Sequence, residues 1–175
     1  MRNQLMFTLV LTLSIVACGS DSSRDPVSPV DPRTATRDRA PDATNTLSIR
    51  GTVETSEIDT YQPETNSLVV QLTGTGVASH LGRFTLVDNG VASLTTGVGA
   101  GSVTYTAADG ATLTGSASGG AVIVGDIAEI TDAITITGGT GRFEGATGSL
   151  AAIRRLDLGT LRSSGSIEGV INLAK

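Results

Sequence analysis

The chain has 175 residues, a formal net charge of −5 and a single lysine, so it offers no basic surface for gripping nucleic-acid phosphates. Its hydrophobic fraction of 39% is too high for a disordered chain, and its 22 glycines are too many for a helical bundle. This length and composition predict one all-β domain together with shorter tails.

Residues 1–17 have the plan of a secretory signal peptide. A positive charge at Arg2 precedes an apolar run over residues 5–16, which is shorter than the roughly 20 residues that a membrane-spanning helix needs. The segment Ile15-Val16-Ala17-Cys18 then resembles the lipobox of bacterial lipoproteins. That resemblance implies cleavage before Cys18 and attachment of lipid to its thiol.

Several acyl chains on Cys18 would hold the mature protein on a membrane without crossing it. Gly19, which follows the cysteine, favours the outer membrane in the sorting rules of enterobacteria. Cys18 is also the only cysteine, so no disulfide can form within the chain. The expectation is an exported protein, lipid-anchored in the bacterial cell envelope, with the membrane as a partner.

Residues 18–45 combine the lipidated cysteine with a disordered tether. This segment contains four of the five prolines and many Ser, Thr, Asp and Arg residues, with almost no large apolar side chain. Such a composition cannot bury enough surface to offset the entropy of ordering. A proline-rich docking ligand is the functional alternative for the same residues.

Residues 46–175 predict a β domain, since 21 of the 22 glycines lie here and apolar residues alternate with polar ones. Each alternating set places its apolar members on one face of a strand: Leu47, Ile49 and Val53; Leu68, Val70 and Leu72; Val103, Tyr105 and Ala107; Leu113, Gly115 and Ala117; Ile134 and Ile136. Residues 88–90 and 108–110 have the Asp/Asn/Gly chemistry of hairpin turns. The glycines at 97, 99 and 101 predict a loop.

About eight such strands fit a sandwich or a closed barrel. Closure removes the exposed sheet edges of a Val/Thr-rich chain, and repeated glycines allow strands to bend at barrel corners. The low aromatic content of 3% and the absence of Trp argue against a transmembrane barrel with aromatic girdles.

The segment over residues 136–148, ITGGTGRFEGATG, resembles the glycine signature shared by plant allene oxide cyclases and, more loosely, dirigent proteins. Residues 74–85 and 165–171 are similar to strands of bacterial secreted relatives with this barrel. The resemblance implies an eight-stranded antiparallel, calycin-like barrel. The signature residues have a structural role in this interpretation, with positive φ at the first glycines and the phenylalanine as a plug: Gly138, Gly139, Gly141, Phe143, Gly145 and Gly148.

The chain offers few reacting groups. His80 is the only histidine and no nucleophile motif accompanies it, so we expect no metal site, no cofactor and no catalytic role for His80. Carboxylates are the remaining candidates, because a barrel interior can raise the pKa of an acid. Those singled out are Glu54, Glu57, Asp126, Glu129 and Asp132, with Arg142, Arg154 and Arg155 as pairing partners. Solvated acids on outward faces are the favoured interpretation, and no catalytic residue is assigned.

Three functions remain open. The favoured one is a non-catalytic, membrane-tethered barrel that binds a small apolar ligand or a protein partner. The second is an isomerase or cyclase acting on a lipid-derived substrate, as the allene oxide cyclase resemblance implies. The third is a structural or adhesive surface protein. The resemblance is compatible with a homo-oligomer, and the sequence does not decide it.

Overall fold

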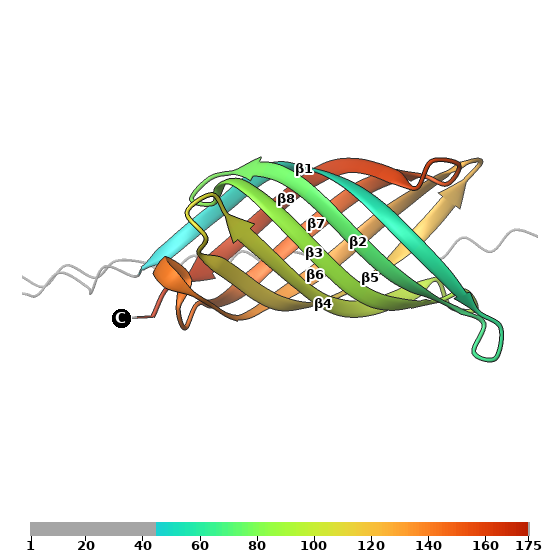
Figure 1. The fold of residues 1–175 in the computed structure, drawn as a ribbon, viewed down its shortest axis with the longest axis horizontal. Helices are drawn as coiled ribbons and strands as arrows, with labels where there is room; N and C mark the ends of the chain where they lie inside the picture. Colours follow the sequence, from blue (N-terminus) through green and yellow to red (C-terminus); the bar gives the residue numbers. More distant parts are fainter. Residues whose placement is uncertain (1–44, 175) are drawn as a thin grey trace, which may run out of the picture. The chain divides into compact units, whose positions relative to one another are not determined.

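A computed structural model describes residues 45–174, which form a single closed β-barrel (Figure 1). The predicted signal peptide, Cys18 and almost all of the predicted tether lie outside the described residues. Eight strands follow one another in chain order: β1 (Thr46–Gln62), β2 (Ser67–Ala78), β3 (Gly82–Ser93), β4 (Val98–Ala107), β5 (Thr112–Val124), β6 (Ile127–Gly139), β7 (Thr147–Asp157) and β8 (Arg162–Asn172). The predicted all-β, eight-stranded antiparallel barrel is confirmed.

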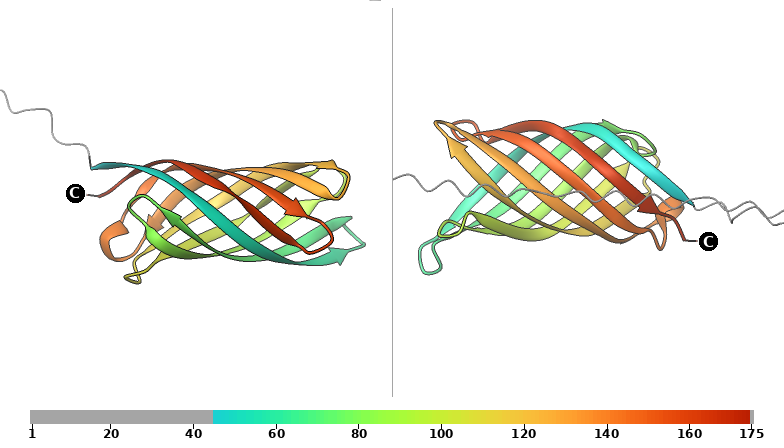
Figure 2. Two further views of the ribbon diagram at one scale, coloured as in Figure 1. Left: turned by 90° about the horizontal axis from the view of Figure 1, so that it is seen from above. Right: turned by 180° about the vertical axis from the view of Figure 1, so that it is seen from behind.

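Each strand pairs with the next in antiparallel fashion, and β1 pairs with β8 to close the sheet. Because the connections are simple up-and-down hairpins, the turns fall alternately at the two ends of the barrel. The first residue of β1 and the last of β8 are register partners, so both chain ends of the barrel lie at one end (Figure 2). The hairpins β1–β2, β3–β4, β5–β6 and β7–β8 form the opposite end.

Alternation along the strands decides what faces the interior. In β1, for example, Ile49, Val53, Thr55 and Glu57 are buried while their immediate neighbours are exposed or half-buried. The sets of apolar residues expected to share a face do point inward. The period of two in the sequence thus turns apolar residues toward the interior and leaves a Thr-rich outer surface.

The end that carries the two chain ends is packed with large side chains and is called the closed end. The largest fully buried residues all belong to strand segments or turns at this end: Ile49, Leu81, Leu113, Phe143, Ile167 and Ile171. Phe143 belongs to the short 3₁₀ helix η1 (Gly141–Phe143) between β6 and β7, and its side chain is completely buried. Arg142 stacks over the same ring, with its guanidinium carbon 4.6 Å from the ring centroid.

Several glycines of the signature allow the backbone to form the turn that contains Phe143. Gly141 has φ +61°, a conformation that other residues rarely adopt, and positive φ also occurs at Gly145 and Gly148. Gly138 and Gly139 do not have positive φ, so the expectation was wrong for them. At Gly139 the reason for glycine is space, because a Cβ there would lie 2.2 Å from the Thr112 carbonyl oxygen.

Two turn predictions were wrong. Residues 88–90 lie inside β3, and both Gly99 and Gly101 lie inside β4. Residues 108–110 form a turn, and Gly97 lies in the β3–β4 loop, as expected. The glycines at 90 and 101 are needed because β3 and β4 approach each other closely at this point. Gly90 and Gly101 are register partners, and a Cβ at Gly101 would lie 2.6 Å from the Asn89 carbonyl oxygen.

Candidate ligand-binding site

The interior toward the open end, where the four hairpins lie, contains a cavity of about 260 Å³. Inward positions in this half carry small residues, so the side chains do not fill the barrel. The small residues that line the cavity include Gly90, Ala92, Gly99, Gly101, Ala117 and Gly119. Larger apolar walls come from β2, β6 and β7, through Leu68, Val70, Leu72, Ile130 and Leu156. The barrel is therefore solid at one end and hollow at the other.

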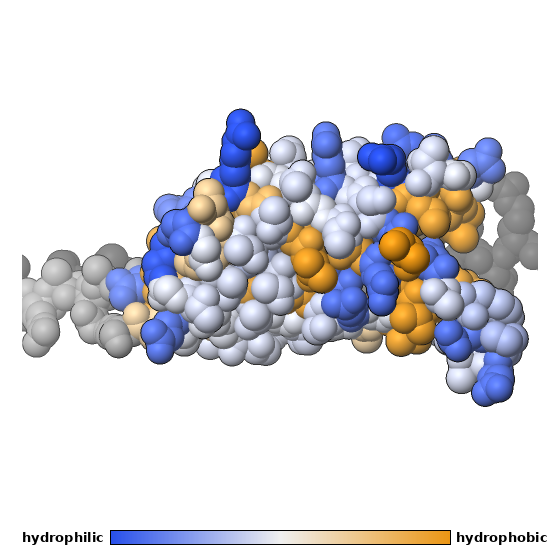
Figure 3. All heavy atoms as spheres, in the orientation of Figure 1, coloured by the Kyte–Doolittle hydropathy of each residue, from blue (hydrophilic) through white to orange (hydrophobic). Residues whose placement is uncertain are grey.

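The surface around the open end is also rich in apolar residues (Figure 3, toward the right). On the β5–β6 hairpin, Val122, Ile123 and Val124 are each about two-thirds exposed. Leu94 and Leu158, from two other hairpins, are exposed as well and also line the cavity. An apolar molecule approaching this end meets apolar side chains before it reaches the interior.

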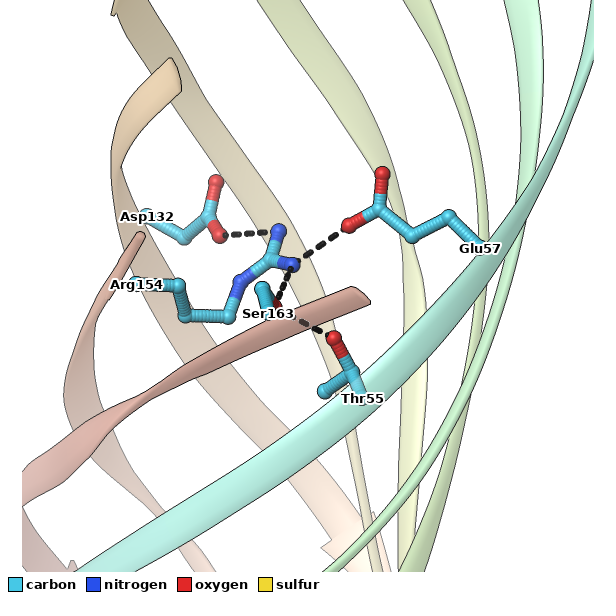
Figure 4. A network of polar contacts seen from close by, with 5 residues as sticks. All are labelled: Thr55, Glu57, Asp132, Arg154 and Ser163. Atoms are coloured by element: carbon cyan, nitrogen blue, oxygen red, sulfur yellow. Dashed lines mark hydrogen bonds and ion pairs between the residues drawn. The ribbon is translucent and has the colours of Figure 1, made fainter. Parts of the chain in front are cut away.

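Arg154, from β7, is the centre of a polar cluster on the cavity wall (Figure 4). Its Nη1 donates to Glu57 Oε1 of β1 at 2.6 Å, and its Nη2 donates to Asp132 Oδ2 of β6 at 3.3 Å. Nη1 also donates to Ser163 Oγ of β8 at 3.2 Å. Ser163 and Thr55 share a buried hydroxyl–hydroxyl hydrogen bond of 2.5 Å. Four strands therefore contribute to one buried network.

Burial controls the protonation of this network. Loss of hydration raises the pKa of Glu57 above its usual value, because burial outweighs the attraction of Arg154. Burial alone would lower the pKa of Arg154, but its hydrogen bond to Glu57 and the charges of Glu57 and Asp132 raise it instead. Arg154 therefore stays positively charged within the barrel wall.

Asp88 and Asp59 also line the cavity and form no ion pair within residues 45–174. Burial, reinforced by the charges of Asp132 and Glu57, raises the pKa of Asp88 to about 6 despite the opposing charge of Arg154. Burial also raises the pKa of Asp59. One oxygen of Asp59, Oδ1, is buried without a hydrogen-bond partner among the described residues.

Tyr105 lies on the inward face of β4, and its ring meets the edge of Phe84 at a centroid distance of 5.7 Å. Burial, with the nearby charge of Asp88 as the next contribution, raises the pKa of the Tyr105 phenol well above its usual range. The phenol therefore remains neutral.

Of the acids singled out in the sequence, the structure brings Glu57 and Asp132 together around Arg154 and leaves the others outside. Glu54, Asp126 and Glu129 are exposed. The favoured interpretation, that the acids are solvated, was thus wrong for Glu57 and Asp132 because strand parity turns both side chains inward.

The three arginines differ in the same way. Arg155 reaches Glu129 at 3.8 Å on the exposed surface, where such a pair contributes little. Arg142 pairs with Asp109 and donates to the His80 carbonyl oxygen at 3.1 Å. His80 itself is exposed in the β2–β3 turn.

Sequence reasoning missed Asp59, Asp88 and the two hydroxyl residues Thr55 and Ser163. Asp59 shares its parity with Val53 and Glu57, which is a usable signal for an inward position. Asp88 shares its parity with Phe84 and Leu86, but its Asp-Asn-Gly context favoured a turn. No local sequence pattern predicts that Thr55 contacts Ser163, because only closure of the barrel brings β1 beside β8.

Two further geometric findings concern residues 45–174 alone. No group of three or more His, Cys, Asp or Glu side chains is arranged there to hold a metal ion. The same stretch contains no helix long and apolar enough to cross a membrane.

Comparison with known proteins gives structural likeness only. No family model and no curated protein matches the chain. Among solved structures, it is similar to the pterocarpan synthase dirigent protein GePTS1, with 16% identity and a TM-score of 0.55, covering 81% of this chain and 99% of that one. The pterocarpan synthase dirigent protein PsPTS1 gives 15% identity and a TM-score of 0.54, covering 74% and 96%. The domain is therefore a dirigent-like barrel in fold.

Proposed function

We propose that this protein is a lipid-anchored barrel of the bacterial cell envelope that holds a small, largely apolar molecule in the cavity at its open end without transforming it. The observation that carries the ligand-binding part is the division of the interior into a packed half and a hollow half. A purely structural or adhesive barrel has no need for a hollow half. Small-molecule sites are typically concave, mostly apolar and equipped with a few polar groups, as this cavity is.

The dirigent-like fold supports the same proposal. The two similar solved structures are proteins called pterocarpan synthase dirigent proteins, which associates this barrel type with small molecules. In the present chain the proposed role is to hold and orient a ligand. The envelope location rests on the lipobox-like segment ending at Cys18, and the outer membrane is the proposed membrane.

The test is native mass spectrometry of the full-length chain purified from its own envelope, comparing Ala92→Leu with Ala133→Leu. Ala92 lines the cavity, whereas Ala133 is exposed on the outer face of β6, so the two variants add the same atoms inside and outside. We expect wild type and Ala133→Leu to retain a small-molecule mass that Ala92→Leu loses. Bare protein in all three, or equal retention by both variants, would contradict cavity binding.

A second candidate is an isomerase or cyclase that acts on a lipid-derived substrate. The observation that favours it is Asp88, which lines the cavity and has a pKa raised by burial to about 6, close to the value that suits proton transfer near neutral pH. The retained molecule itself is the substrate to assay. Conversion by wild type but not by Asp88→Asn, with Asp126→Asn unaffected, would establish catalysis. Release of the molecule unchanged from wild type favours simple binding.

A further inference from the structure

We propose that the ligand of the cavity is a small amphiphile whose single cationic head group, such as a primary ammonium, pairs with Asp88 while its apolar part lies against the β2, β6 and β7 wall. This inference deepens the proposed function and rests on it. It names the charge of the ligand, which neither the fold nor the likeness to dirigent proteins supplies.

The first step is the balance of charge inside the barrel. Four carboxyl groups, those of Glu57, Asp59, Asp88 and Asp132, line the cavity together with one guanidinium, that of Arg154. Arg154 is already engaged by two of these acids, at 2.6 Å and 3.3 Å. The cavity therefore has an excess of negative charge that the described side chains do not neutralise.

The second step is the location of this excess charge. Within the described chain, Asp88 takes part in no salt bridge, and Asp59 keeps a buried oxygen without a hydrogen-bond partner. A partly buried carboxylate without a partner is costly, and a bound cation with N–H donors would offset this cost directly. A ligand carboxylate at the same place would add a further negative charge.

The third step is the size and polarity of the remaining space. At about 30 Å³ per water, a cavity of about 260 Å³ accommodates about nine water-sized atoms. Beyond the acids and Arg154, its wall is formed mainly by Leu, Val, Ile, Ala and Gly residues, together with Ser93 and Ser118. This space fits one polar head and a short alkyl or ring system.

Binding of such a cation is expected to depend on pH through Asp88. The titratable groups around Asp88 are Glu57 of β1, Tyr105 of β4, Asp132 of β6 and Arg154 of β7. Asp59 lies further along β1 toward the open end, and the cavity-lining residues of β2 carry no titratable group. With the pKa of Asp88 raised by burial to about 6, lowering the pH from 7.5 to 5 leaves about a tenth of this carboxyl ionised.

The experiment uses octylamine, octanol and octanoate as probes, titrated calorimetrically into the full-length chain at pH 7.5 and pH 5. We expect octylamine to bind at least tenfold more tightly than octanol at pH 7.5, and octanoate to bind more weakly still. Octylamine remains protonated across this range, so its affinity should fall about tenfold at pH 5. Asp88→Asn should reduce the affinity for octylamine to that for octanol. Asp126→Asn, at an exposed site, should leave the affinity for octylamine unchanged.

The controls separate failure of this inference from failure of the proposed function. Octanol or octanoate binding as tightly as octylamine, with loss of binding in Ala92→Leu, would overturn the cationic head group and leave cavity binding intact. Octylamine binding that survives both Asp88→Asn and Ala92→Leu would show attraction to the acidic outer surface and would also overturn the inference. No binding by any probe, together with bare protein from the envelope, would overturn both proposals.

Discussion

At the residue scale, Asp88 places a partly buried negative charge beside the cavity at neutral pH. Its pKa in the folded protein, raised by burial to about 6, exceeds the ordinary value of 3.8. The native state therefore binds more protons than the unfolded chain between about pH 4 and pH 6. Stability linked to this group is consequently present below about pH 4 and is lost as the pH rises through 6.

We predict that Asp88→Asn stabilises the protein at pH 7.5 by about 1–2 kcal/mol, because asparagine cannot ionise. This value is below the full linkage energy since Asp88 is only half-buried and water screens part of its charge. Urea denaturation at pH 7.5 and pH 4 measures the effect, and the gain should disappear at pH 4. Asp126→Asn provides the exposed control. Equal stabilisation of Asp88→Asn at both pH values would show that ionisation is not the cause.

Arg154 has the opposite energetic role, because it compensates two acids that face the interior. Removing it in Arg154→Met leaves Glu57, whose side chain is 4% exposed, charged and without its partner. The expected loss is about 3–5 kcal/mol at pH 7.5, with a smaller loss at lower pH as Glu57 becomes protonated. The neighbouring Arg155→Met, on the outer face of β7, should change stability by less than about 0.5 kcal/mol. Equal effects of the two variants would contradict a structural role for the buried network.

At the element scale, the strands followed directly from the sequence while some turns did not. Alternation from Leu47 to Ile136 predicted which residues face inward, because a strand buried on one side forces a period of two. The error at residues 88–90 arose because Asp, Asn and Gly suit both a turn and a strand that needs a small residue. Which of the two applies depends on β4, the strand that lies against Gly90.

The close approach of β3 and β4 can be tested at Gly101. A Cβ at this position would lie 2.6 Å from the Asn89 carbonyl oxygen and 2.7 Å from the Gly90 Cα, so Gly101→Ala must push two strands apart. We predict a loss of about 1–3 kcal/mol in urea denaturation. Gly99→Ala is the matched control on the same strand, since its Cβ would meet Ala92 and Val91 at 3.4 Å. Similar stabilities of the two variants would show that β3 and β4 have room to separate.

The polar cluster marks the limit of sequence-based prediction. The sequence allows three members of the cluster to be named as candidates: Glu57, Asp132 and Arg154. Glu57 and Arg154, however, are 97 positions apart in the chain and meet only because the sheet closes. Closure depends on strand number, tilt and register together, which no local pattern specifies. The acids of the cavity therefore became a site only once the barrel was assembled.

At the scale of the whole molecule, β1 begins at the closed end of the barrel, while the cavity opens at the opposite end. β1 begins at Thr46 beside the last residues of β8, and the packed residues around Phe143 lie at this end. The described residues that line the cavity all belong to the barrel, so removal of the proposed anchor at Cys18 should change where the protein is found without changing what the barrel binds.

We predict that Cys18→Ala moves the protein from the membrane fraction to the soluble fraction or leaves it unprocessed, because the proposed lipid anchor would have no thiol to join. Cell fractionation and intact mass measurement test this, with Ser22→Ala as a control that keeps Cys18. Wild type and the control should carry an added acyl mass, whereas Cys18→Ala should not. Released Cys18→Ala protein should bind octylamine as wild type does, since the described residues that line the cavity all belong to the barrel. A wild-type product without any acyl mass would refute the anchor while leaving the cavity and its ligand to be judged by the binding experiments alone.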